Sequence, residues 1–256
     1  MGAQLQLPTA SIVGFLLVLV RTGTWVMICP PFGTKMVPVQ VKVGFAFALA
    51  LAMTPHLQSQ AVPLELPAIV SAAFMQAAAG IALGFLGVLL FSAFQSAGSL
   101  IDLFGGFATA QLFDPMSGSQ ASIFGRFYQL MATVLLFATG GHLLLVRGFL
   151  ATFDAVPAGG PSIDVVAGVF RHGITTFFVA AIEIAAPLLA ALFLADVALG
   201  ILAKAAPEMN VLLLGMPLKI LLTISLAAVA IPLLPDAVSN LTNQVVVGGL
   251  HMAGVR

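Results

Sequence analysis

Long apolar runs separated by short polar connections make up most of the chain. Six of these runs are candidate membrane spans, at residues 10–29, 37–53, 67–104, 127–146, 165–202 and 211–234. A bilayer core of roughly 30 Å needs about 20 helical residues, which most of these runs provide. Ala, Leu and Phe dominate them without period-two alternation, which disfavours strands. The pattern predicts an all-α, multi-pass membrane protein of about six hydrophobic segments.

Two of the runs are much longer than a bilayer requires. As single helices, residues 67–104 and 165–202 would each measure about 57 Å at 1.5 Å per residue. Such a run must break into a hairpin, tilt strongly, or bury its excess length against protein. Gly80, Gly84 and Gly87 allow close helix packing in the first long run. Pro187 offers a kink in the second, so long kinked helices and helical hairpins are expected.

The composition supports a membrane environment. Hydrophobic residues make up 61% of the chain and charged residues 7%, with a mean hydropathy of +1.14, whereas a soluble domain typically carries about 25% charged residues. Nine basic and nine acidic residues cancel, so nucleic-acid binding driven by phosphate charge is not expected. Membrane lipid is the expected surrounding. Cys29 is the single cysteine, which excludes an internal disulfide and indicates a packing role.

Ionisable side chains inside apolar runs are costly, so each is a functional candidate. The main ones are Arg21, Asp102, Glu183 and Asp196. Glu183 and Asp196 lie about 220° apart around a helix, so they do not form a paired-carboxylate site. Asp196 and Lys204 lie about 80° apart, which permits a neighbouring ion pair. A structural ion pair, a charge facing a partner protein and a proton relay all remain open for Asp196.

The sequence contains no pattern typical of an enzyme. No phosphate loop, HExxH motif or dinucleotide fingerprint is present, and no Ser-His-Asp order is found. The four histidines have no spacing that would assemble a metal site. We therefore expect no catalytic residue, no metal and no cofactor.

A polar stretch, ATAQLFDPMSGSQAS at residues 108–122, separates two strongly apolar runs. Gly105 and Gly106 are expected to end the preceding helix, and Asp114-Pro115 to form a turn. Gly118 adds freedom, and Ser119 or Ser122 can cap a helix that begins near Ile123. Irregular backbone is tolerated at membrane depth only where protein buries it or water reaches it. The residues alone leave open a simple turn or a functional loop.

Several stretches carry a family resemblance when taken in order. The first stretch has an arginine in the first helix, before a Pro-Phe-Gly connection, and reads RTGTWVMICPPFGTKMVPVQVKVGFAFALALAMTP (21–55). The second stretch contains the Ala97-Gly98 and Asp114-Pro115 pairs and reads GIALGFLGVLLFSAFQSAGSLIDLFGGFATAQLFDPMSGSQASIFGRF (80–127). Gly140-Gly141-His142 and APLLAALFLADVALGILAKAAPEMNVLLLGMPLK (186–219) follow. Together they resemble the FliR family of flagellar type III export-gate subunits and its SctT relatives in injectisomes.

The sequence departs from the family's pattern at a few positions. A glutamate that the family often has before the Gly80 stretch is Gln76 here. The usual arginine and Pro-Gln-x-Asn near the last turn are Lys204 and Pro207-Glu208-Met209-Asn210. These differences affect any role assigned to those side chains and leave the order of the matching stretches intact.

The resemblance implies a specific assembly. One FliR-like subunit is expected to join FliP-like and FliQ-like subunits in a helical export gate, with FlhB-like and FlhA-like components next to it. Residues 1–160 would be the FliP-like part and residues 161–256 the FliQ-like hairpin and tail. The gate would pass unfolded flagellar proteins across the bacterial inner (cell) membrane in the flagellar basal body.

The resemblance also implies a role for the polar stretch. The family's plug loop occupies the corresponding position, about residues 105–122. The side chains expected to fill or shape the plug are Phe107, Leu112, Phe113, Asp114, Pro115 and Met116. Gly105, Gly106, Gly118 and Pro187 would act as hinges or turns.

A different class of function remains as the alternative. A secondary transporter or proton channel could use Glu183, Asp196 and Arg21 near the middle of the membrane. Such a protein would be favoured by an inverted repeat with broken helices at corresponding positions. The sequence shows no such repeat.

Overall fold

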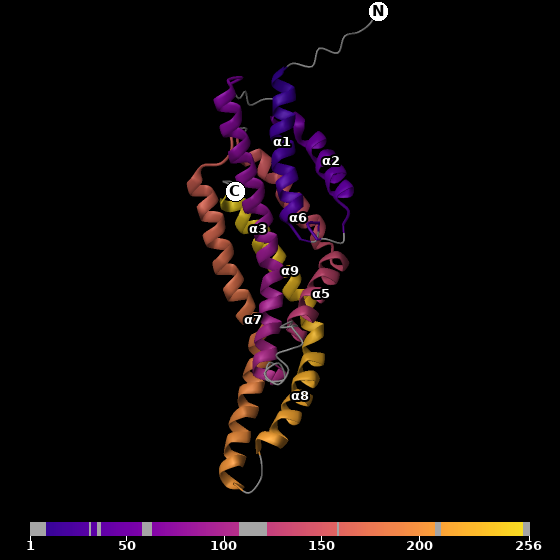
Figure 1. The fold of residues 1–256 in the computed structure, drawn as a ribbon, viewed down its shortest axis with the longest axis vertical. Coiled ribbons are helices and arrows are strands. Elements are labelled where there is room, and N and C mark those ends of the chain that lie inside the picture. The colour runs from indigo at the N-terminus through magenta and orange to yellow at the C-terminus, as the bar shows by residue number, and fades with distance from the viewer. Residues whose placement is uncertain are drawn as a thin grey trace, which may run out of the picture. The chain divides into compact units, whose positions relative to one another are not determined.

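The computed structural model describes residues 9–30, 32–34, 37–57, 63–107, 122–157, 159–207 and 211–252. All regular elements of these residues are helices (Figure 1). In chain order they are α1 Thr9–Ile28, α2 Val39–Leu57, α3 Leu66–Gly105, α5 Ile123–Ala138, α6 Gly141–Ala155, α7 Ile163–Ala205, α8 Val211–Ala230, the 3-10 turn η2 Ile231–Leu233, and α9 Leu234–Met252. The all-α prediction is confirmed for this part of the chain.

The helices have the length and composition of a multi-pass membrane protein. Four helical stretches are long and apolar enough to cross a membrane, at Thr9–Ile28, Leu66–Gly105, Ile163–Ala205 and Gly215–Leu250. A fifth span results if α5 and α6 act as one broken span. The break between them contains Gly140, whose φ of 76° is in the region that favours glycine. The remaining predicted segment corresponds to α2, whose apolar part Val39–Pro55 is shorter.

The two overlong runs form continuous helices. α3 has 40 residues and α7 has 43, and α7 remains helical on both sides of Pro187. At 1.5 Å per residue they measure about 60 Å and 65 Å, roughly twice a hydrocarbon core. Neither run therefore folds back as a hairpin within itself, which was one of the predicted possibilities.

The described helices group into two compact units, and the long helices α3 and α7 contribute to both. The first unit comprises Met1–Leu90, His142–Thr176 and Thr242–Arg256. The second comprises Phe91–Gly141 and Phe177–Leu241. The boundaries fall inside helices, so each unit is made of segments that are distant in sequence.

In the first unit, α1 and α2 lie side by side (Figure 1). The Thr22 hydroxyl of α1 donates a hydrogen bond to the Ala46 carbonyl of α2, with an oxygen–oxygen distance of 3.2 Å. Trp25 of α1 stacks on Phe149 of α6, with ring centroids 4.2 Å apart. The buried core of this unit contains Val18, Trp25, Val26, Cys29, Ala46, Ala50, Phe149 and Phe153.

Glycines let α3 approach α1 closely in the same unit. A Cβ at Gly80 would overlap the Arg21 carbonyl and the Thr24 hydroxyl. A Cβ at Gly84 would lie 3.0 Å from Cβ of Ile28, and one at Gly87 would lie 2.7 Å from Sγ of Cys29. Small residues at such a contact let two helix backbones approach, as in membrane helix pairs. The close packing that these glycines predict is present.

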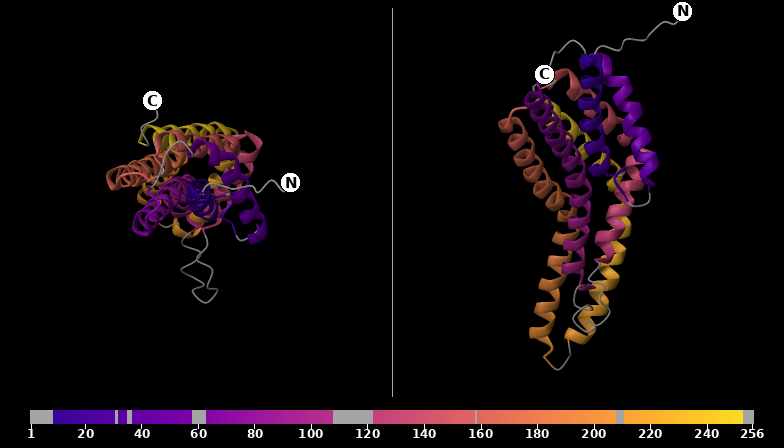
Figure 2. Two further views of the ribbon diagram at one scale, coloured as in Figure 1. Left: turned by 90° about the horizontal axis from the view of Figure 1, so that it is seen from above. Right: turned by 45° about the horizontal axis from the view of Figure 1, so that its top comes forward.

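In the second unit, α8 lies beside the C-terminal part of α7 (Figure 2). Lys219 of α8 and Asp196 of α7 form an ion pair with an N–O distance of 2.7 Å. A Cβ at Gly105 of α3 would lie 2.7 Å from Oγ1 of Thr223 on α8. A Cβ at Gly98 of α3 would overlap the Phe124 carbonyl of α5. Glycine contacts thus bring α3 against both α5 and α8.

We predict opposite effects for two Gly→Ala changes inside helices. Gly80→Ala should lower the free energy of unfolding by about 1–3 kcal/mol, because the new methyl group meets the Arg21 backbone. Gly14→Ala should raise it by about 0.5–1 kcal/mol, because no described atom lies within 4 Å of its Cβ position and alanine favours helix. Thermal unfolding in detergent measures both. A Gly80→Ala variant as stable as the unmodified chain would contradict the contact.

Candidate functional site

Among the described residues of the first unit, Arg21 is the most deeply buried charged side chain. It lies on the face of α1 that also buries Val18, Thr22 and Trp25, and its exposed fraction is 0%. Its Nη2 donates to the Thr152 carbonyl at 3.1 Å and to the Thr152 hydroxyl at 2.6 Å. Its Cζ lies 4.2 Å from the centroid of the Phe153 ring. A cation over an aromatic face is attracted by the ring's quadrupole.

No carboxylate among the described residues pairs with Arg21. Its Nε and Nη1 are buried and find no hydrogen-bond partner within the part of the chain that the structure describes. Its charge is therefore stabilised by two neutral oxygens and an aromatic ring. This arrangement ties α1 to α6 and provides no proton acceptor for a relay.

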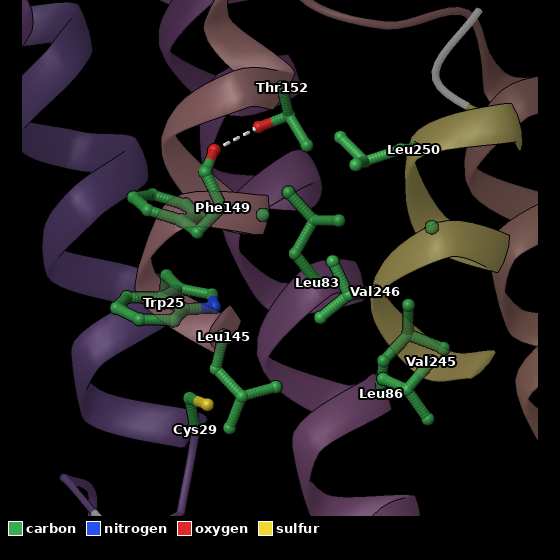
Figure 3. Close-up of a pocket in the computed structure, with 12 residues that line it drawn as sticks. Trp25, Cys29, Leu83, Leu86, Leu145, Phe149, Thr152, Val245, Val246 and Leu250 are labelled. Carbon is green, nitrogen blue, oxygen red and sulfur yellow. Dashed lines mark hydrogen bonds between the residues drawn. The ribbon is translucent and has the colours of Figure 1, made fainter. Parts of the chain in front are cut away.

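A small cavity lies next to this centre (Figure 3). Its volume is about 30 Å³, and Trp25 and Phe149 line one side of it. The Thr152 hydroxyl donates to the Phe149 carbonyl at 2.6 Å. The remaining lining is mostly apolar and includes Leu83, Leu86, Leu145, Val245, Val246 and Leu250. Because ligand pockets usually measure about 300–1,000 Å³, this cavity does not fit a cofactor.

Asp102 organises the second unit near the end of α3. Its exposed fraction is 3%, and its carboxylate accepts a hydrogen bond from the Ser122 hydroxyl. The Phe124 N–H also donates to it, with N–O distances of 3.1 and 3.2 Å. Ser122 in turn caps α5, because its hydroxyl oxygen accepts from the Gly125 N–H at 2.8 Å. A carboxylate at a helix N-terminus is stabilised by free N–H groups and by the helix dipole.

A further contact joins the end of α3 to the start of α5. The rings of Phe107 and Phe124 meet edge to face, with centroids 5.3 Å apart. α3 ends at Gly105, and Gly106 follows with a φ of 86°. The predicted helix end at Gly105 and Gly106 and the predicted Ser122 cap are confirmed. We call this set of contacts, made by Asp102, Phe107, Ser122 and Phe124, the neck.

The predicted plug side chains lie mostly beyond what the structure describes. Phe107 is described and half-buried in the neck. Residues 108–121 are outside the described residues, and they include Leu112, Phe113, Asp114, Pro115, Met116 and Gly118. The plug assignment of these residues therefore stays a prediction, as does the hinge role of Pro187.

The ion pair predicted for Asp196 has a different partner. Asp196 pairs with Lys219 of α8, whereas Lys204 is exposed near the end of α7. Spacing along one helix favoured Lys204, but the folded hairpin brings a lysine 23 positions away to 2.7 Å. Glu183, in contrast, is exposed on α7. Thus Arg21, Asp102 and Asp196 each have a described structural partner.

Sequence reasoning missed the partners of these charges. Thr152, Phe149 and Phe153 have no polar or charged pattern that would single them out, although the two phenylalanines four residues apart share a helix face. Among the described residues, no group of three or more His, Cys, Asp and Glu side chains could hold a metal ion. These features define a multi-pass helical membrane protein in which Arg21, Asp102 and Asp196 make contacts between helices.

Comparison with known proteins identifies the family. A family model described as "Bacterial export proteins, family 1" matches residues 12–245. The flagellar biosynthetic protein FliR of Bacillus subtilis is 32% identical over 231 residues, covering 88% of this chain and 89% of that protein. FliR of Escherichia coli is 30% identical over 229 residues, covering 89% and 87%. The Yop proteins translocation protein T of Yersinia pestis is 31% identical over 143 residues, or 55% of each chain.

The family model and the two FliR proteins each match most of this chain. The chain belongs to the FliR family of bacterial export proteins. The resemblance deduced from the ordered stretches is confirmed.

The neutral surroundings of Arg21 lead to a prediction. Arg21→Lys should destabilise the chain by about 2–3 kcal/mol, because an ammonium keeps a buried charge but loses the planar stacking and the paired hydrogen bonds. Arg21→Met should cost less, because both Thr152 oxygens keep other partners, the Val156 N–H and the Phe149 carbonyl. Thermal unfolding in detergent measures which of the two variants is the less stable. Arg126→Met, a change at an exposed arginine, is the control. The reverse order would contradict this description.

Proposed function

We propose that the chain is a subunit of the type III flagellar protein-export gate. In this role it forms part of the pore that passes unfolded flagellar proteins across the bacterial inner membrane. The observation that carries this proposal is the similarity to flagellar FliR proteins of two bacteria along 87–89% of their length. The translocation protein T matches over 55% of its length, which favours the flagellar system over an injectisome.

The proposed partners are FliP-like and FliQ-like gate subunits, with FlhB-like and FlhA-like export components. Residues 1–160 correspond to the FliP-like part and residues 161–256 to the FliQ-like part. The lengths of α3 and α7 support burial against other subunits, because helices of about 60 Å extend well past a hydrocarbon core. Large apolar side chains remain exposed on both helices, including Phe74 (70%) and Leu194 (67%).

A pore for polypeptides also needs a seal. Each elementary charge that crosses the membrane is driven by about 2.3 kcal/mol per 100 mV, so an empty open pore would leak ions. We assign this seal to the segment of about residues 105–122, with Phe107, Leu112, Phe113 and Met116 as its apolar filling. The neck supports the assignment because it holds both ends of the segment, at Phe107 and Ser122, against each other. An exported chain could then displace the segment without unwinding α3 or α5.

Two of the three charges that the transporter alternative would use already contact other side chains. Arg21 is held by Thr152 and Phe153, and Asp196 by Lys219. Because both side chains are already engaged by other residues, neither is free to take part in proton transfer.

The gate assignment predicts a stable assembly. Co-expression of this chain with FliP-like and FliQ-like subunits from the same genome should give one hetero-oligomer in mild detergent. Size-exclusion chromatography and mass measurement check the result. Recovery of this chain only alone or as a homodimer, while the other two subunits assemble together, would reject the assignment.

The seal predicts a leak when its apolar filling is removed. Residues 108–121 are replaced by a Gly/Ser segment of the same length, so that Phe107, Ser122 and the neck are retained. The complex should still assemble, while cells or vesicles that contain it become more permeable to ions by about tenfold or more. Ion flux into vesicles measures this, and a Gly/Ser replacement of the connection at residues 58–62 is the control. Unchanged permeability in an assembled complex would refute the seal.

A further inference from the structure

Glu183 lies on the side of α7 that faces away from the second unit. The side chains of α7 that this unit buries most deeply include Ala181, Ala185, Leu188 and Leu192. At 100° per residue these four lie about 140–200° around the helix from Glu183. Glu183 is exposed, which agrees with its position on the opposite side of the helix from these four residues. Its carboxylate therefore points outward from the folded chain.

The neighbours of Glu183 on this face are apolar. Val179, Leu194 and Ile201 lie within about 40° of it around the helix. Their exposed fractions are 49%, 67% and 66%. Pro187 and Ala190 complete the face and are also exposed. We call this surface, from Val179 to Ile201, the Glu183 face.

Glu183 is also far from both ends of α7. It is 20 residues from Ile163 and 22 residues from Ala205, or about 30 Å from each end of the helix. α7 is one of the helices that are apolar enough to cross a membrane. A carboxylate in the middle of such a helix costs about 2.5–3.5 kcal/mol on membrane-insertion scales. Lipid alone is an unfavourable surrounding for it.

Glu183 presents a second acceptor besides its carboxylate. Pro187 is four residues further along α7 and has no N–H, so the Glu183 carbonyl lacks its helical donor. No hydrogen bond or ion pair to the Glu183 side chain is found within the described ranges, and Lys219 is already paired with Asp196. One residue thus offers a negative charge and a carbonyl without its i+4 helical donor in an apolar surface.

We propose that the Glu183 face binds a helix of another gate subunit that carries an arginine or lysine at the level of Glu183. The inference rests on the proposed function and adds the chemistry of one contact. A basic side chain complements the charge, and a guanidinium has enough donors for both the carboxylate and the carbonyl. The apolar neighbours favour a protein helix over pore water, because a water-filled wall would present further polar groups. Ala190 leaves room for a close approach.

The test uses the complete chain co-expressed with FliP-like and FliQ-like subunits. Glu183→Lys should reduce the recovered complex by about tenfold or more, because two like charges would meet in an apolar contact. Glu183→Gln should reduce it less, because the amide keeps a hydrogen-bonding side chain. Asp164→Lys is the matched control, because Asp164 is an exposed acid in the first turn of the same helix. The isolated variants should unfold at the same temperature as the unmodified chain.

A photo-reactive side chain locates the partner helix. Placed at position 190 in the assembled complex, it should cross-link to one segment of another subunit, and that segment should contain a basic residue. Placed at position 178, about 140° around α7 from Glu183, it should not give that product. Exchanging the basic residue for glutamate should restore assembly of the Glu183→Lys chain.

Three results would overturn the inference. The first is normal recovery of the complex with Glu183→Lys. The second is rapid labelling of Glu183→Cys, in a Cys29→Ala chain, by a membrane-impermeant thiol reagent after assembly, since this shows that the face meets water. The third is cross-linking from position 190 to lipid alone. If the unmodified chain itself fails to join the other subunits, the proposed gate function falls as well, and that outcome is distinct from the other three.

Discussion

Charged groups inside an apolar protein need partners, and among the described residues Arg21, Asp102 and Asp196 each find one on another helix. With 7% charged residues and helices built for a membrane, little water is available to solvate those groups. Arg21 is held by Thr152 and by the ring of Phe153. Asp102 is held by the start of α5, and Asp196 by Lys219. Each of these contacts joins two helices, so the requirement to satisfy a polar group also determines which helices pack together.

Glycines allow further close contacts between helices next to two of these charges. Gly80 lets α3 reach the backbone of Arg21, and Gly98 lets α3 reach the backbone of Phe124. Backbones that approach so closely leave little room for a shift in register, because each neighbouring side chain is packed against the facing helix. The charge contacts join α1 to α6, α3 to α5 and α7 to α8, and the glycine contacts bring α3 close to α1 and α5.

The two ends of the polar segment are held by contacts that the structure describes. The ends are fixed by a buried carboxylate, a helix cap and an edge-to-face ring pair. The middle contains Asp114-Pro115 and Gly118, residues typical of turns. The seal proposed for this segment rests on these anchored ends and on the family resemblance.

The amino-acid sequence alone determined the all-α class, most of the apolar helices and the helix end at Gly105 and Gly106, and it named Ser122 as one of two candidate caps; it did not predict the break between α5 and α6 or the helix α9. The predicted features depend on local properties, namely apolar runs, glycines that end a helix, and a serine hydroxyl next to free N–H groups. The order of the matching stretches also determined the family. The sequence did not reveal that Arg21 bonds a residue 131 positions away, or that Asp196 prefers Lys219 to Lys204. Only the tertiary structure decided those pairings, because a partner on another helix depends on how whole helices pack, and helical periodicity describes one helix at a time.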